Sequence, residues 1–320
     1  NPMHQTSPLF QQNPVPPPPV LLSAKNASSI SPSPFNSGGT RLSEPYFSVA
    51  EESKKACHNF FCMKRLSEAD NHGYIFLFSC YPVHPVIQCG PTCGMVALAM
   101  ASELVGDGCV TTEEILSEAT KREFSKSGEM FSASAMQELA SHFLPCQTEC
   151  LRLQHTESPS WYHGRELIEQ LANRNIALVP YDADRNHAPC QKLGHKAHWA
   201  LLTGFFIAFR DPDVPEEFLR HCEREPDTPS IYYWPTNPDA SLCNQLTDLV
   251  LENKADVLVL GRHGKCKYTG LWPLKDLVLS NANLVEVSPE RTSDVYVIPY
   301  GGLDAGLRSQ VVIIHSNIKS

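Results

Sequence analysis

The sequence lacks the features that place a protein in a membrane or on a nucleic acid. No apolar run reaches the roughly 18 residues that a transmembrane helix needs. Lys and Arg number 26 against 35 Asp and Glu, which gives a net charge of -9, and no stretch is rich in Lys and Arg. Neither nucleic acid nor an anionic membrane is therefore an expected partner. The N-terminus also lacks the basic and apolar regions of a signal peptide, so we expect a cytoplasmic protein.

Regular cysteine spacing is also absent, although the chain has twelve cysteines. Without an export signal or a repeating framework, free thiols are expected rather than disulfides. The first residue is Asn1 and not an initiator Met. This leaves open that residues precede it.

The composition divides the chain into two parts. Residues 1–45 are rich in Pro, Ser, Asn and Gly and show no hydrophobic period, which predicts a disordered segment. Its run Pro16 to Pro19 favours a polyproline II helix, which is either a spacer or a ligand for an SH3 domain, a WW domain or profilin. Residues 46–320 are expected to form one folded domain.

Within the folded part, helical periods come first and strand patterns follow. Helices are predicted over 93–106, 111–124, 132–144 and 163–175, and strands over 74–79, 176–182, 198–209, 256–263, 283–287, 294–300 and 310–316. The acidic, proline-interrupted residues 211–247 are expected to form an irregular insertion. This order predicts an α+β fold with N-terminal helices packed on a mostly antiparallel sheet.

Cys93 is the strongest candidate for a nucleophile. It lies at the predicted start of a buried helix, between Pro91 and Gly94. The unpaired N–H groups of a helix start favour a thiolate, which is the reactive form of cysteine. Cys89 lies before the turn and is given no role. The competing interpretation, that Cys93 is only a small buried residue, would prevail if no other catalytic group accompanied it.

Two further residues complete a candidate site. His198 begins a long apolar strand, where a general base would be held rigidly. Gln88, five residues before Cys93, could donate to an oxyanion together with the Cys93 backbone N–H. We expect Cys93 and His198 to rest as a thiolate and a protonated imidazole.

At these residues the chain resembles the papain-like cysteine peptidase superfamily, near its bacteriocin-processing branch. Residues 128–136, 178–204 and 295–307 are also similar to peptidases that process the N-terminus of actin. The resemblance implies a papain-like fold, with nucleophile Cys93, base His198 and oxyanion residue Gln88, whose spacing is one residue shorter than in papain. It also implies an aminopeptidase that removes the acetylated first residue, Met or Cys, of immature actin. Profilin would then be recruited by the proline-rich segment.

The third catalytic residue of that superfamily, an Asn or Asp that orients the imidazole, has no clear counterpart. Asn281, Asn283, Asp276 and Asp211 are all candidates. If none of them orients the ring, the site works as a dyad.

Three other functions compete with a peptidase. His187, Cys190, His195 and His198, together with Cys89 and Cys93, could bind zinc, although their spacings are not the usual ones, and we expect no metal and no cofactor. A non-enzymatic adaptor that only binds actin and profilin would not require the three catalytic residues. A transglutaminase-like or deubiquitinating enzyme would share the thioester chemistry.

Overall fold

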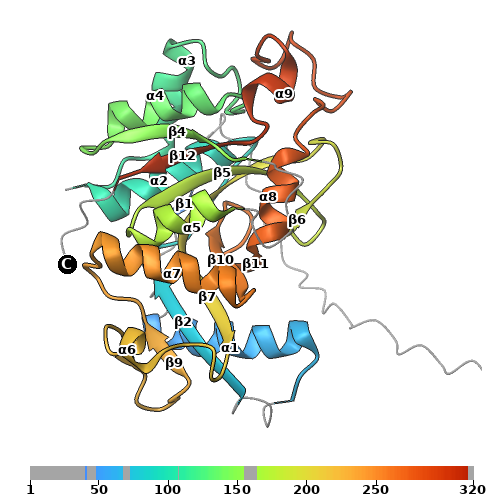
Figure 1. The fold of residues 1–320 in the computed structure, drawn as a ribbon. Coiled ribbons are helices and arrows are strands. Elements are labelled where there is room, and N and C mark those ends of the chain that lie inside the picture. The colour runs from blue at the N-terminus through green and yellow to red at the C-terminus, as the bar shows by residue number, and fades with distance from the viewer. Residues whose placement is uncertain (1–39, 42–47, 68–72, 107, 155–163, 316–320) are drawn as a thin grey trace, which may run out of the picture. The chain divides into compact units, whose positions relative to one another are not determined.

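The computed structural model describes residues 40–41, 48–67, 73–106, 108–154 and 164–315 (Figure 1). The predicted polyproline run lies outside these residues. Thr40 and Arg41 form β1 (Thr40–Arg41), which pairs with β3 (Val86–Ile87), so two residues of the segment predicted to be disordered belong to a strand. No helix in the described ranges is long and apolar enough to cross a membrane.

The described domain is built on a ten-stranded sheet. The main strand order is β4-β12-β5-β7-β2-β9-β8, with β10 joining β7 to β11 and with β6 on β5. Every pairing is antiparallel except that of β2 with β9. The expected α+β class with a mostly antiparallel sheet is therefore confirmed. The strands are β2 (Tyr74–Cys80), β4 (Thr148–Arg152), β5 (Ile176–Ala183), β6 (Pro189–Cys190), β7 (Ala197–Arg210), β8 (Glu223–Arg224), β9 (Ile231–Tyr233), β10 (Asp256–Arg262), β11 (Gly270–Pro273) and β12 (Gln310–Ile314).

Helices cover both faces of the sheet, and the alternation along β7 divides the core between them. Trp199 and Leu201 belong to the core under α2, whereas Ala200 and Leu202 belong to the core under α5 and α7, the two helices drawn in front of the sheet in Figure 1. The helices are α1 (Val49–Lys64), α2 (Cys93–Val105), α3 (Thr112–Lys121), α4 (Ala133–Phe143), α5 (Arg165–Ala172), α6 (Glu216–Leu219), α7 (Ala240–Glu252), α8 (Leu274–Ala282) and α9 (Gly302–Gly306).

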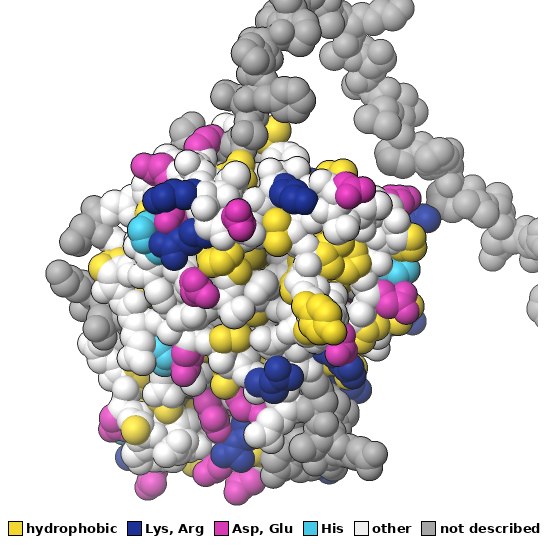
Figure 2. All heavy atoms as spheres, turned by 90° about the horizontal axis from the view of Figure 1, so that it is seen from above, with side chains coloured by type: hydrophobic (Ala, Val, Ile, Leu, Met, Phe, Trp, Pro, Cys, Tyr) yellow, Lys and Arg dark blue, Asp and Glu magenta, His cyan; other side chains and the backbone are white. Residues whose placement is uncertain are grey.

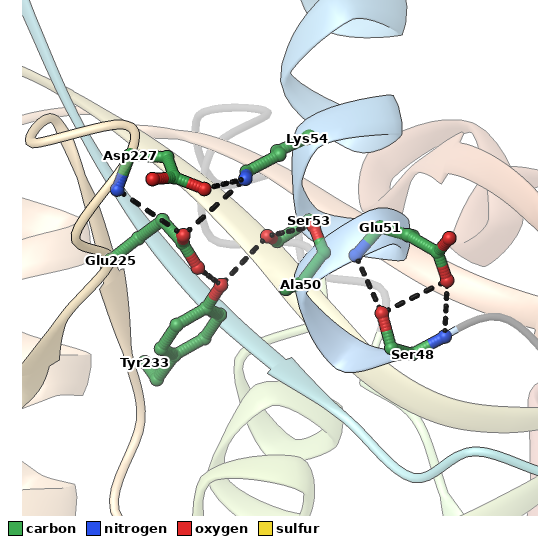
Figure 3. Close-up of polar contacts among 8 residues, drawn as sticks. All are labelled: Ser48, Ala50, Glu51, Ser53, Lys54, Glu225, Asp227 and Tyr233. Atoms are coloured by element: carbon green, nitrogen blue, oxygen red, sulfur yellow. Dashed lines mark hydrogen bonds and ion pairs between the residues drawn. The ribbon is translucent and has the colours of Figure 1, made fainter.

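Helix α1 is capped at its start and tied to the hairpin of β8 and β9 (Figure 3). The Glu51 carboxylate accepts from the Ser48 N–H at 2.8 Å, while the Ser48 hydroxyl accepts from the Glu51 N–H at 3.2 Å. This capping box satisfies two donors that a helix start leaves unpaired. Farther along α1, the Ser53 hydroxyl contacts the Tyr233 hydroxyl at 3.1 Å, and Tyr233 donates to the Glu225 carboxylate.

Four predicted helices are confirmed, as α2, α3, α4 and α5, but two predicted strands are wrong. Residues 283–287 and 294–300 form loops because their N–H groups do not bond to a neighbouring strand. The N–H groups of Val285 and Glu286 donate to the Leu193 carbonyl, and the Val297 N–H donates to the Glu129 carboxylate at 2.8 Å. Both apolar segments are thus held by loop contacts.

The insertion at 211–247 is also more regular than predicted, since it contains α6, β8, β9 and the start of α7. Asp239 caps α7 by accepting from the Leu242 N–H at 2.7 Å. Leu242, Leu246 and Val250 then form a buried stripe at helical spacing. The sequence analysis did not predict this helix, because the residues before Asp239 are polar and rich in proline.

Candidate active site

A cavity of about 300 Å³ brings together the three residues proposed from the sequence. Gln88, Cys93 and His198 all line it, although they come from the segment after β3, the start of α2 and the start of β7. The other lining residues are Gly90, Pro91, Glu129, Met130, Phe131, Ala183, Asp184, Arg185, His187, Lys196, Ala197, Lys265, Arg291 and Tyr296. Cys89 is exposed and does not line the cavity.

Cys93 is the first residue of α2, as the sequence predicts. The N-cap residue Thr92 makes no side-chain bond to the helix, because its hydroxyl donates instead to the Cys89 carbonyl at 2.9 Å. A Cβ on Gly94 would lie 3.0 Å from the Met130 Cβ and 3.3 Å from the Trp199 ring, so glycine lets this end of the helix pack closely without moving its neighbours. Cys93 is 8% exposed and lines the cavity.

Gln88 is fixed between two backbone segments. Its N–H donates to the Gly264 carbonyl at 2.8 Å, and its side-chain Nε2 donates to the Gly90 carbonyl at 2.7 Å. A side-chain amide nitrogen carries two hydrogens, so the bond to Gly90 leaves one donor available. Within the described ranges, the buried Oε1 has no hydrogen-bond partner.

His198 lies directly opposite Tyr181 in the pairing of β5 with β7. The next residue, Trp199, is buried and donates from its indole Nε1 to the Met130 carbonyl at 2.8 Å, which fixes the start of the strand against the loop at the cavity. His198 is 8% exposed, and its Nε2 is buried without a partner among the described residues. Since Nε2 is enclosed, Nδ1 is the nitrogen that can face the cavity.

The protonation states differ from the thiolate and imidazolium expected from the sequence. Burial, with smaller contributions from the neighbouring His263 and Lys265, lowers the pKa of His198 to about 3. Burial raises the pKa of the Cys93 thiol, and the backbone N–H groups of Trp199 and Gly94 only partly offset this. Both shifts favour a neutral thiol and a neutral imidazole over the resting ion pair expected from the sequence.

None of the four candidates for a third catalytic residue lines this cavity. Asp211 follows the far end of β7, and Asp276 is an exposed residue of the first turn of α8. The Asn283 Oδ1 accepts from the Leu193 N–H at 2.8 Å. Asn281 Nδ2 donates to the carbonyls of Pro180 at 2.9 Å and Gln310 at 3.1 Å, and no contact of its side chain with His198 is found among the described residues.

The buried Asp182 organises the loop before His198, and the sequence analysis gave it no role. Its carboxylate accepts from the N–H groups of Lys192 at 2.6 Å, Gly194 at 3.0 Å and Lys196 at 3.1 Å. The sequence does contain a signal for this role, since Asp182 is an acidic residue at the end of an apolar strand. A carboxylate that is buried there requires hydrogen-bond donors around it.

The fold brings Cys93, His187 and His198 to the same cavity but leaves the other residues considered for zinc outside it. His195 contacts Glu286 at 3.2 Å and does not line the cavity, while His187 does. Cys190 belongs to β6, and Cys89 is exposed. Within the described ranges, no group of three or more His, Cys, Asp or Glu residues is arranged to hold a metal ion.

Positive side chains dominate the cavity lining, which the sequence analysis did not anticipate. Arg185, Lys196, Lys265 and Arg291 line it, and no hydrogen bond or ion pair of their side chains is found among the described residues. The two acids are already engaged: Glu129 accepts three backbone N–H groups, and Asp184 contacts Lys192 at 2.5 Å. On the face shown in Figure 2, by contrast, acidic and basic side chains are interspersed with hydrophobic ones.

Comparison with known proteins gives consistent results. Residues 83–206 match the family described as "Actin maturation protease-like, C-terminal domain". The chain is 33% identical over 253 residues to the actin maturation protease of Danio rerio, covering 75% of each chain. It is 33% identical over 280 residues to the Xenopus tropicalis protein, covering 85% of this chain and 82% of the relative. It is 35% identical over 244 residues to the Homo sapiens protein, covering 75% of this chain and 66% of the relative. No solved structure matches the chain.

Proposed function

This chain belongs to the actin maturation protease family, and from that premise we propose that it is a cysteine aminopeptidase of papain-like fold. Its substrate is immature actin, from which it removes the N-acetylated first residue, Met or Cys. Cys93 is the nucleophile, His198 is the proton carrier, and Gln88 contributes to the oxyanion site.

The observation that carries this proposal is the convergence of Gln88, Cys93 and His198 on one cavity. A hydrogen bond network or a packed core can explain one polar residue in such a place. It does not explain a thiol at a helix start, an imidazole and an amide that share one enclosed space. A pure adaptor for actin has no need of this arrangement.

In the proposed reaction, Nδ1 of His198 takes the proton of the Cys93 thiol as the sulfur attacks the carbonyl carbon of the substrate's first residue. The Cys93 backbone N–H and the remaining Gln88 Nε2 hydrogen donate to the oxyanion. His198 then transfers its proton to the leaving amine, and a thioester remains on Cys93. Water, deprotonated by His198, hydrolyses the thioester and releases the acylated residue.

The cavity lining supports a substrate that is acidic beyond its first residue. Four cationic side chains line it, whereas its two carboxylates are held by protein groups. Apolar side chains, Met130, Phe131 and Tyr296, line it as well and suit the side chain of a first-position Met or Cys.

The decisive assay uses peptides that begin with acetylated Met or Cys followed by acidic residues. We expect Cys93→Ala to abolish cleavage, because no other thiol lines the cavity among the described residues. Cys89→Ala is the matched control, since Cys89 is exposed and lies outside the cavity. Full activity of Cys93→Ala would contradict the assignment.

The proline-rich segment is proposed to recruit profilin, which would present bound actin to the domain. Deletion of residues 13–22 should leave peptide cleavage unchanged and slow the processing of actin in complex with profilin. Equal rates of the two proteins on that complex would contradict recruitment.

A further inference from the structure

The base of the proposed reaction lacks the usual means of orientation. For Nδ1 to accept the thiol proton, the neutral imidazole must carry its hydrogen on Nε2. That nitrogen is buried, and it has no hydrogen-bond partner among the described residues. In most sites of this kind a carboxylate or amide oxygen accepts this hydrogen and fixes the ring.

Aromatic rings occupy the space around His198 instead. The His263 ring packs on it with a centroid separation of 5.7 Å and an interplanar angle of 73°. The Tyr181 ring packs on it at 5.8 Å and 85°. Both contacts are edge-to-face, a favoured arrangement for rings, and N–H groups also make weak contacts with ring faces.

His263 is itself held firmly, as a positioning group must be. It follows the last residue of β10, Arg262, which pairs with Leu201 on the strand of His198. Its ring stacks on Trp272 with a centroid separation of 5.9 Å and an angle of 20°. His263 is 4% exposed, and its Nδ1 accepts from the Lys265 N–H at 3.3 Å.

This last bond also determines what His263 can do. Because Nδ1 accepts a hydrogen bond, the hydrogen of neutral His263 lies on Nε2, and neither ring nitrogen is free to accept from His198. Burial lowers the pKa of His263 to about 4, so the neutral form prevails near pH 7. A hydrogen-bonding role like that of an Asn or Asp is therefore not available to it.

We infer that His263 positions His198 by ring packing, instead of through the hydrogen bond that an Asn or Asp would accept. This inference rests on the proposed function of His198 as the base. The rings of Tyr181, His187 and His263 around the imidazole restrict its rotation and keep Nδ1 directed at the cavity, and Trp272 packs behind Tyr181 and His263. It also excludes water from Nε2.

Three variants of His263 separate packing from hydrogen bonding in the peptide assay. His263→Phe keeps a ring but no hydrogen-bonding group, His263→Asn supplies an amide oxygen but no ring, and His263→Ala supplies neither. A catalytic group displaced by about 1 Å can cost about 100-fold in rate, so we expect Ala and Asn to lower kcat by about 10- to 100-fold with little change in KM. Phe should be about tenfold faster than Ala, since it restores the packing.

The pH profile adds a measurement that a general loss of stability would not change. Burial is the main cause of the low His198 pKa. His263→Ala admits water beside Nε2 and should move the acid limb of kcat/KM to higher pH. His263→Phe removes the charge of His263 but keeps the burial, so it should move the limb by much less. Circular dichroism and thermal unfolding establish that each variant is folded. If His263→Ala does not fold, the kcat values of the Phe and Asn variants distinguish ring packing from hydrogen bonding.

Two results would overturn the inference. An Asn variant that is faster than the Phe variant would indicate a hydrogen-bonding third residue, and wild-type kcat in all three variants would show that His263 does not position the base. A wild-type enzyme that cleaves no acetylated peptide would instead contradict the proposed function.

Discussion

The neutral resting pair predicts an unusual dependence of activity on pH. An ordinary histidine, with a pKa of about 6.5, is neutral in about 3% of molecules at pH 5. With the pKa of His198 lowered to about 3, about 99% of molecules hold a neutral base at that pH. The acid limb of kcat/KM, which reports the free enzyme, should therefore lie below pH 4, and activity at pH 5 should exceed that of an ordinary histidine about 30-fold.

The alkaline side of the pH profile tests the protonation state of Cys93. Because burial raises the Cys93 pKa above its usual value, the thiol form persists to high pH. A rate that depends on a thiol and a neutral base should not fall between pH 7 and 9. A resting thiolate and imidazolium would instead lose activity as the imidazolium loses its proton.

The assay measures kcat/KM from pH 4 to 10 with an acetyl-Met peptide that has no titratable side chain, so that only the enzyme titrates. Alkylation of Cys93 by iodoacetamide, followed in the Cys89→Ala variant to remove an exposed competing thiol, should accelerate with pH beyond 9. An acid limb near 6.5, an alkaline decline below 8.5, or a labelling rate that is already constant at pH 7 would refute the reasoning. Circular dichroism at each pH detects unfolding.

Three further predictions concern the surroundings of the site. Asp182→Asn should lower the free energy of unfolding, measured in urea, by about 2–4 kcal/mol, because hydrogen bonds to a charged group contribute about 1.5–3 kcal/mol each. The control is Asp184→Asn, which changes an exposed carboxylate and should alter this free energy little. Equal effects of the two variants would contradict the role of Asp182. Lys265→Glu should raise KM about three- to tenfold for an acidic peptide and less for a neutral one, with the difference shrinking in high salt; a uniform change would argue against charge recognition. The free energy of unfolding should fall as pH drops below 6.5, because the unfolded chain binds protons at His198 and His263, whereas the folded chain, in which their pKa values are about 3 and 4, does not. Each histidine should lower the free energy of unfolding by about 2 kcal/mol at pH 5. In a variant with Gln at both positions, urea unfolding should show a shallower decline.

The sequence was informative where chemistry and structure are local. The apolar residues after Cys93 predict a buried helix, and the turn around Pro91 predicts its start, because helix signals are contained within a few residues. The apolar run after His198 predicts a central strand in the same way. The strands predicted over 283–287 and 294–300 fail because their apolar pattern is satisfied by loop packing. Their N–H groups bond to Leu193 and Glu129, which are distant in the sequence.

The sequence by itself therefore determined the α+β class and the identities of Cys93, His198 and Gln88 as candidate site residues. Only the tertiary structure decided how they behave. The pKa values depend on burial and on neighbours from other strands, and the contact of His263 with His198 arises from the pairing of β10 with β7. Local sequence patterns carry no record of these contacts, because residues far apart in the chain become neighbours only when the sheet forms.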